Sequence, residues 1–271
     1  MPGNTEAEPA TCHQERSAGD TSNYPRHMGV EYQPIINTKN DREHGYEALA
    51  RFWNEAQQLV PPDKVFGQLH HDASLLLEVE EKAKRMQVAH APAHGQLFLN
   101  LDPHAYHSGN SRYETLFRHL QSRPHVVVEL IENSNHSEGL LSERLAARLA
   151  KAKLEIAVDD LGAEGSMVSF PVLMAAKYIK LDRSWMLRRN DDAYITLLET
   201  LIDYARRSNK WTVLEGIESE ADLGFARQLG VDFVQGFLYR ERFSLIRPAH
   251  QECGNPMLTH RPTQPELCPY E

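Results

Sequence analysis

The sequence predicts an α/β fold in the form of a (β/α)8 barrel, with a doubly wound open sheet as the alternative. Eight apolar runs of strand length recur along about 220 residues, and helical patterns separate most of them. Near-continuous apolar strands that alternate with helices are typical of a parallel sheet covered by helices. Seven successive runs also carry a polar or charged residue near the carboxyl end, the edge at which barrel active sites lie. The number of strands and the length together favour the barrel.

The elements are expected in a regular order. Strands are predicted at residues 31–37, 45–52, 96–101, 125–131, 154–160, 176–182, 211–216 and 231–238. Helices are predicted at residues 64–88, 112–121, 138–153, 191–208 and 219–229. No GxGxxG or GxxxxGK[ST] motif follows a strand, so a glycine loop that cradles phosphate is not predicted.

The two ends of the chain lack such patterns. Residues 1–29 are rich in small and polar residues and are expected to form a disordered N-terminal arm. Residues 248–271 contain five prolines and no long apolar face, so an irregular C-terminal tail is expected. The globular domain is therefore assigned to residues 30–247.

Charge and cysteine content exclude several functional classes. The formal net charge is −9, which disfavours binding to duplex DNA or to an anionic membrane surface. No apolar run approaches the roughly 20 residues that span a bilayer, so membrane insertion is not expected. The three cysteines, Cys12, Cys253 and Cys268, lie near the ends and form no disulfide framework or CxxC site. A reducing, cytoplasmic location is the simplest interpretation.

The polar residues at the strand ends predict a metal site. In a parallel barrel these ends meet at one face, which brings together groups that are far apart in sequence. So many acids in one place cannot all be ionised unless cations hold them. Carboxylate and amide oxygens suit Mg²⁺, Mn²⁺ or Ca²⁺ better than zinc. The converging residues are Glu47, Asn100, Glu129, Asp159, Asp160, Lys180, Asp182, Glu215 and Gln235.

The histidines give no comparable signal. No HExxH pair occurs, and the histidines of HHDAS (70–74) and HAPAH (90–94) are expected to be solvated rather than ligating.

Eight short motifs, in order, carry a resemblance to a known family. YQPI, GYEALARF, NL, VELIE, VDDLG, KLDRS, EGIES and QGF resemble the EAL-domain family of cyclic di-GMP phosphodiesterases over about residues 31–243. The resemblance implies a modified TIM barrel whose first strand is antiparallel to the others. It also implies hydrolysis of cyclic di-GMP to linear pGpG in bacterial second-messenger signalling, with Mg²⁺ or Mn²⁺ as cofactor and Ca²⁺ as inhibitor.

The same resemblance implies roles for individual residues. Glu47, Asn100, Glu129 and Asp159 match the ligands of one metal ion, and Asp159 and Asp160 match residues that reach a second. Glu215 matches a glutamate that acts as base or as a ligand that organises the attacking water, and Lys180 matches the lysine near that water. Gln33, Leu49 and Arg51 match positions that line the nucleotide, Gln235 matches a glutamine of the site, and Glu132 matches a glutamate that braces the loop after the paired aspartates. Asp182 and Glu218 also match family positions.

The loop after the paired aspartates departs from the family pattern. The sequence DDLGAEGSM stands where the family has roughly DDFGAGYSS, so Leu161, Glu164 and Gly165 are unusual. In the family this loop couples metal binding to dimerisation, and a homodimer through residues near 163–190 is expected. A cyclic di-GMP receptor with weak or no catalysis therefore stays open, as does a protein-interaction module. A sensor or cyclase domain that is not in this chain is the other expected partner.

Overall fold

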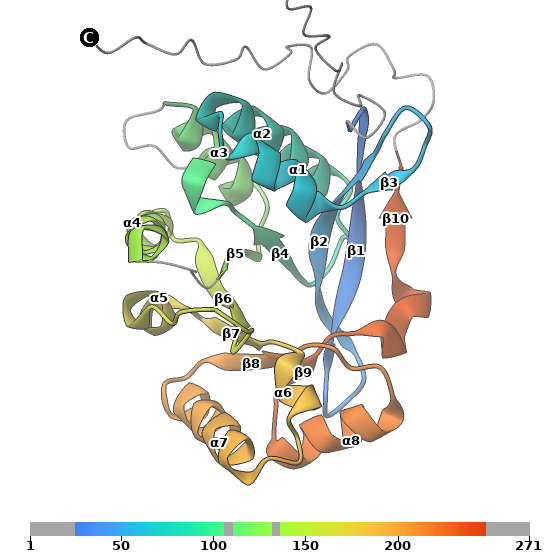
Figure 1. The fold of residues 1–271 in the computed structure, drawn as a ribbon, viewed down its shortest axis with the longest axis vertical. Coiled ribbons are helices and arrows are strands. Elements are labelled where there is room, and N and C mark those ends of the chain that lie inside the picture. The colour runs from blue at the N-terminus through green and yellow to red at the C-terminus, as the bar shows by residue number, and fades with distance from the viewer. Residues whose placement is uncertain (1–24, 106–110, 132–135, 248–271) are drawn as a thin grey trace, which may run out of the picture.

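Eight strands close into a barrel in the computed structural model, which describes residues 25–105, 111–131 and 136–247 (Figure 1). The strand β1 pairs antiparallel with β2 on one side and with β9 on the other, and this second pairing closes the sheet. The modified TIM barrel with one antiparallel strand is thereby confirmed, and the open sheet is excluded. The barrel strands are β1 (His27–Asn37), β2 (Glu43–Trp53), β4 (Gln96–Asn100), β5 (Val126–Ile131), β6 (Glu155–Leu161), β7 (Tyr178–Leu181), β8 (Trp211–Leu214) and β9 (Phe233–Val234).

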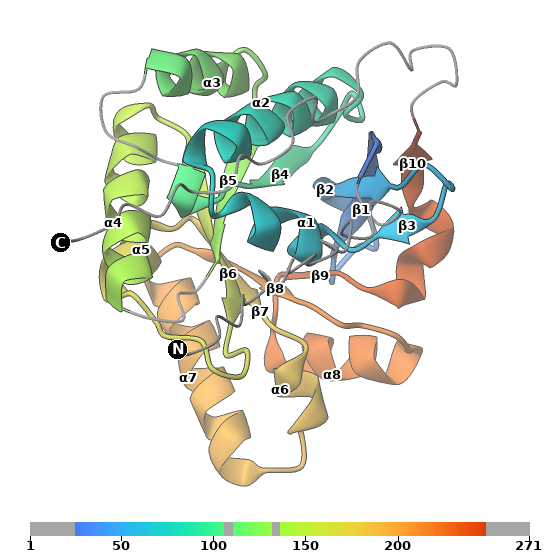
Figure 2. The same ribbon diagram turned by 45° about the horizontal axis from the view of Figure 1, so that its top comes forward.

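Helices surround the barrel, and two short strands extend its edges (Figure 2). The strand β3 (Leu59–Val60) pairs with β2, and β10 (Ser244–Ile246) pairs with β1. The helices are α1 (Pro62–Leu69), α2 (Ala73–Ala89), α3 (Ser111–Gln121), α4 (His136–Lys151), α5 (Phe170–Ala175), α6 (Ser184–Leu187), α7 (Asp192–Arg207) and α8 (Glu220–Leu229), with short 3₁₀ helices at Pro103–Ala105 and Phe237–Arg242. Within the described part of the chain, no helix combines the length and the apolar character that crossing a bilayer requires.

Three predicted boundaries were wrong. The strand expected at 231–238 covers only Phe233–Val234, and a 3₁₀ helix begins at Phe237. The helix expected at 64–88 is interrupted, because the side chain of Asp72 accepts from the backbone N–H groups of Ser74 and Leu75 and starts α2 as a new helix. The first strand was expected at 31–37, in a domain that starts at residue 30. Instead β1 begins at His27, which pairs with Trp53 of β2. The remainder of the predicted N-terminal arm (residues 1–24) and the C-terminal tail lie outside the described residues.

An apolar plug fills the interior of the barrel. It consists of side chains from seven strands, all buried: Ile35, Phe98, Val127, Ala157, Tyr178, Val213 and Phe233. Side chains alternate faces along a strand, so the residue two positions further on also points inward. On the parallel strands that residue is polar: Asn100 follows Phe98, Glu129 follows Val127, and Lys180 follows Tyr178. The plug therefore leaves a polar layer at the carboxyl ends of the strands.

His44 lies against the amino-terminal side of this plug. Its ring stacks on Phe233 with a centroid separation of 3.9 Å, and Nε2 lies 3.1 Å from the Tyr178 hydroxyl. Burial lowers the pKa of His44 from 6.5 to about 4, against the opposing effect of the Asp232 charge. The imidazole is therefore neutral in the folded protein at pH values where it would be charged in the unfolded chain.

The protein should lose stability as the pH falls from 6.5 towards 4. In this range the unfolded chain binds a proton at His44, whereas the folded protein does not. The expected loss is roughly 1–2 kcal/mol after allowance for solvent contact of the half-buried ring. Replacement His44→Phe should remove this part of the pH dependence, measured as the free energy of unfolding in urea at pH 7 and pH 5. The control variant His71→Gln, at an exposed histidine, should keep the parent slope, and an equal slope in all three proteins would contradict the assignment.

Candidate active site

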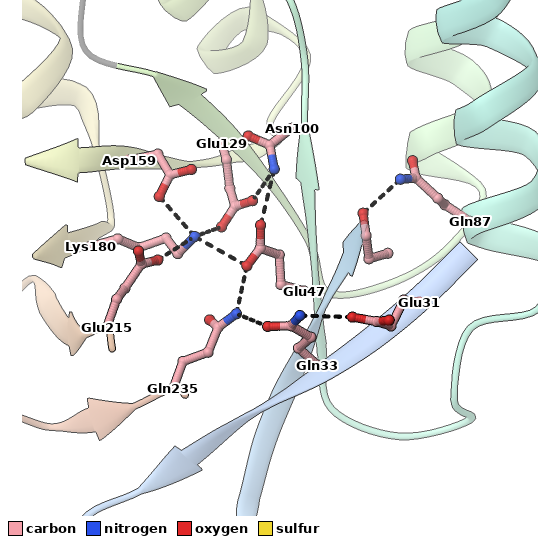
Figure 3. Close-up of polar contacts among 11 residues, drawn as sticks. Glu31, Gln33, Glu47, Gln87, Asn100, Glu129, Asp159, Lys180, Glu215 and Gln235 are labelled. Atoms are coloured by element: carbon pink, nitrogen blue, oxygen red, sulfur yellow. Dashed lines mark hydrogen bonds and ion pairs between the residues drawn. The ribbon is translucent and has the colours of Figure 1, made fainter. Parts of the chain in front are cut away.

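The buried ammonium of Lys180 is the centre of the polar layer (Figure 3). Its side chain is 1 % exposed, and Nζ contacts carboxylates from four different segments. The distances from Nζ are 2.7 Å to Glu129 Oε1, 2.8 Å to Asp159 Oδ1, 2.8 Å to Glu215 Oε1 and 3.5 Å to Glu47 Oε2. One lysine on β7 thus links β2, β5, β6 and the residue that follows β8.

Two amide side chains complete the layer. Asn100 Nδ2 donates to Glu47 Oε1 at 3.1 Å and to Glu129 Oε2 at 3.0 Å. Gln235 Nε2 donates to Glu47 Oε2 at 2.6 Å. Glu47 therefore receives hydrogen bonds from both sides as well as the Lys180 charge, and its orientation is set by three neighbouring segments (Figure 3).

A β-bulge lets Asp159 and Asp160 serve the same site. Between the pairs Val158–Ile179 and Leu161–Leu181, β6 contains two residues where β7 contains only Lys180. Neighbouring side chains on a regular strand point to opposite faces, but the backbone of Asp160 turns into the left-handed region with φ of 54°. Both carboxylates consequently border the cavity at the mouth of the barrel.

The electrostatics show an excess of negative charge. Burial alone would lower the pKa of Lys180, but Asp159, Glu129 and the other carboxylates raise it well above its ordinary value, so the ammonium stays charged. One ammonium cannot balance five acids. Burial, with the Asp159 charge added and Lys180 opposing, raises the pKa of Asp160 to about 7, and burial raises that of Glu215 to about 8.

The pKa values of the three most buried acids of the site shift in different directions. Burial and the neighbouring Glu47 charge raise the pKa of Glu129 well above its ordinary value, and burial raises the pKa of Asp159. Burial also disfavours ionisation of Glu47, but Lys180, Gln235 and Asn100 outweigh it and hold the pKa of Glu47 below its ordinary value. The site thus favours a carboxylate at Glu47 and lacks enough positive charge for the rest.

The acids fall into two groups that could each hold a metal ion. Glu47, Glu129 and Asp159 offer oxygens within 4.8 Å of one another, and so do Asp159, Asp160 and Glu215. Asp159 belongs to both groups, as expected for a carboxylate between two ions. The all-oxygen donor set and the unbalanced negative charge both fit hard divalent cations.

A cavity of about 780 Å³ opens above this layer. Gln33, Leu49 and Arg51, predicted to line the nucleotide, all border it. Glu31 is a further residue here that the motifs did not predict: its Oε1 accepts from Arg51 Nη2 and from Gln33 Nε2, both at 2.8 Å. The signal for it was its position two residues before Gln33 on the same face of β1.

Three predicted site residues are not among the contacts of the polar layer described above. Glu218 borders the cavity but is exposed. Asp182 does not line it, and its Oδ1 instead accepts from the backbone N–H of Ser184 at the start of α6. Glu132 lies outside the described residues.

The unusual loop after β6 is anchored at its first residues. Trp185 Nε1 donates to the carbonyl oxygen of Leu161 at 2.7 Å, and Ser184 Oγ donates to that of Gly162 at 2.8 Å. Gly162 has φ of 94°, and an added Cβ would lie 2.4 Å from Trp185 Nε1, so only glycine fits there. Of the three departures from the family pattern, Leu161 is buried at the end of β6, and Glu164 and Gly165 are exposed beyond this anchor.

Comparison with known proteins agrees with this geometry. The chain matches the EAL domain family over residues 24–242. It is 26 % identical over 226 residues to the bifunctional diguanylate cyclase/cyclic di-GMP phosphodiesterase MucR of Pseudomonas aeruginosa, covering 79 % of this chain and 33 % of MucR. It is 25 % identical over 224 residues to the probable cyclic di-GMP phosphodiesterase PdeD of Escherichia coli, covering 79 % and 41 %. The chain therefore spans about a third to two fifths of the length of these relatives.

Solved structures share the fold. The phosphodiesterase of MucR in complex with cyclic di-GMP aligns with a TM-score of 0.60 at 20 % identity, over 83 % of this chain and 93 % of that one. The YkuI protein of Bacillus subtilis, which has an EAL domain and was solved with cyclic di-GMP and calcium, aligns with a TM-score of 0.65 at 20 % identity, over 82 % and 56 %. From the match over residues 24–242, the barrel and the acidic layer at its mouth, we conclude that this chain belongs to the EAL domain family.

Proposed function

We propose that this chain hydrolyses one phosphodiester bond of cyclic di-GMP and releases linear pGpG. The observation that carries the proposal is the set of five carboxylates around Lys180 at the base of a cavity that Gln33 and Arg51 also border. The relatives named as cyclic di-GMP phosphodiesterases support the substrate.

The metal ions of this reaction would be Mg²⁺ or Mn²⁺. Glu47, Glu129 and Asp159, with the Asn100 amide beside them, would hold one ion, and Asp159, Asp160 and Glu215 the other. Bound there, the ions would supply electrophilic activation of water and of the phosphodiester. Ca²⁺ would occupy the same oxygens but tolerates looser geometry, and we expect it to inhibit.

The protein's own groups have separate tasks. Arg51 would bind a phosphate through its guanidinium, and Gln33 would donate beside it. Lys180 would orient the carboxylates by donating to several of them at once. Glu215 is partly open to the cavity and would accept the proton of the attacking water while the bond from phosphorus to the 3′ oxygen breaks.

A receptor that binds cyclic di-GMP without cleaving it is the second candidate. The observation that favours it is the altered loop, in which Glu164 and Gly165 replace the residues of the family pattern. The anchor of that loop on Trp185 and Ser184 supports the enzyme, because it keeps the bulge with Asp160 in place.

The proposal extends to partners and location. A homodimer would use the segment after β6, where an apolar patch of Met167, Val168, Phe170 and Met174 is exposed. A sensor or cyclase domain beyond this chain would regulate the activity. The reaction would take place in the cytoplasm, in line with the cysteine pattern of the sequence.

Purified protein should convert cyclic di-GMP to pGpG with Mg²⁺ or Mn²⁺ and not with Ca²⁺, measured by chromatography of the nucleotides.

Substitution Glu47→Gln should reduce kcat by about 100-fold or more, because it removes the carboxylate shared by Lys180, Asn100 and the proposed metal ion. The matched control is Glu43→Gln on the same strand, an exposed residue outside the cavity. Parent-like turnover by Glu47→Gln would refute the site, and binding without product in the parent protein would favour the receptor.

Substitution Glu31→Gln should lower the KM for cyclic di-GMP about fivefold and leave kcat unchanged. The Glu31 carboxylate competes with a substrate phosphate for Arg51, and a partly buried pair of this kind contributes about 1 kcal/mol. Steady-state kinetics on this variant and on the exposed control Glu55→Gln would measure the effect. A rise in KM would mean that Glu31 instead holds Arg51 ready for the substrate.

Substitution Phe170→Glu should shift the protein from dimer to monomer, since it places a charge in the exposed apolar patch. Light scattering after size-exclusion chromatography would measure the mass. The control Leu59→Glu changes an equally accessible leucine on β3, away from the patch, and should leave the dimer intact. A parent protein that is monomeric at all concentrations would contradict the dimer.

A further inference from the structure

A second group of potential metal ligands lies at the rim of the same cavity. His70, Asp102 and His104 offer one ligand atom each within 4.8 Å of one another, and all three border the cavity. We call these three residues the rim cluster. Asp102 Oδ2 lies 2.6 Å from His70 Nε2, and Asp102 Oδ1 lies 3.0 Å from His104 Nδ1. The imidazole rings face each other with a centroid separation of 4.5 Å.

The pattern HHDAS predicts a solvated His70, but the fold gives its ring a partner in Asp102. His70 follows α1, whereas Asp102 and His104 belong to the connection after β4, 32 residues later in the case of Asp102. The closed barrel brings these two segments together. The local sequence around HHDAS does not predict that contact.

A buried ion pair on α2 holds the backbone of the rim cluster in place. The backbone N–H of Asp102 donates to Glu80 Oε1 on α2 at 3.2 Å, and Lys84 contacts the other oxygen of Glu80 at 2.7 Å. Glu80 and Lys84 are both buried. Asp102 Oδ1 also accepts from the backbone N–H of His104 at 2.8 Å, which sets the turn between the two ligands.

We propose that the rim cluster binds one divalent transition-metal ion of the zinc class, separate from the ions of the acidic layer. Ligand atoms around such an ion are about 3 to 3.5 Å apart, because metal bonds to nitrogen and oxygen are about 2.0–2.2 Å long. The two distances in the rim cluster require only small shifts to reach that spacing. Two imidazoles and one carboxylate favour zinc, cobalt, nickel or iron over magnesium.

The proposed ion would link two segments of the cavity rim and add positive charge there. It would join the end of α1, whose residues Asp63, Phe66 and Gly67 also border the cavity, to the connection after β4. Three protein ligands leave at least one coordination position for water or for an anion in the cavity. With one carboxylate and two neutral imidazoles, the site would carry net positive charge opposite an otherwise acidic floor. This inference does not depend on the proposed hydrolysis.

The test uses the untagged chain of 271 residues, stripped of metal and kept in millimolar Mg²⁺ so that the acidic layer is occupied. Zn²⁺ binding is measured by competition with a chromophoric chelator, and Co²⁺ is added to a second sample as a spectroscopic probe. We expect one tight Zn²⁺ site and visible Co²⁺ absorption typical of low coordination number. Zn²⁺ should also raise the melting temperature.

Variants locate that site. The double variant His70→Gln with His104→Gln should weaken Zn²⁺ binding at least about 100-fold and abolish the Co²⁺ absorption. The exposed neighbour His71→Gln should behave as the parent, and Glu47→Gln with Asp160→Asn should retain the Zn²⁺ site. Circular dichroism without metal checks that each variant folds. The proposal is overturned if the parent binds no Zn²⁺ tightly or if the double variant keeps the parent affinity. The rim cluster would then be a hydrogen-bonded network in which Asp102 accepts from two imidazoles.

Discussion

The contact of one buried ammonium with four carboxylates is the constraint on which the rest of the structure depends. An isolated buried charge costs several kcal/mol, and removing one partner from such a group leaves the others uncompensated. Because the acids come from β2, β5, β6 and the end of β8, Lys180 can be satisfied only if the strands between them are in register. The same contact keeps the acids close enough to share cations. Stability and the proposed chemistry thus depend on the same group of side chains.

The antiparallel strand β1 changes how the barrel mouth is built. On the parallel strands the plug residue precedes the polar residue, as Phe98 precedes Asn100. On β1 the order is reversed, and Gln33 precedes Ile35. This reversal brings Gln33 to the mouth together with Glu31, which then meets Arg51 across the antiparallel pair β1–β2. One wall of the cavity is therefore a hairpin with paired charges, and the acidic layer forms the floor.

Much of the fold and of the site could be predicted from the sequence. The period-two pattern that places Glu129 two residues after Val127 predicts both the strand and its polar end, because strand geometry requires it. The order of the motifs predicted the family and the antiparallel β1. The errors have physical reasons. Asp72 was not recognised as a helix cap inside the pattern 64–88, and the two-residue strand β3 depends on pairing with β2 rather than on its own composition.

The sequence by itself determined the alternation of strands and helices, the polar residue at each strand end, and the oxygen donors that these residues carry, since these follow from side-chain chemistry and local periodicity. Only the tertiary structure decided that Lys180 is the common partner of the acids, that a bulge turns Asp159 and Asp160 to the same side, and that Glu31 pairs with Arg51. It also decided that His70 meets Asp102 and His104. The reason is that these contacts join segments that lie far apart along the chain or depend on strand register, and closure of the barrel sets both.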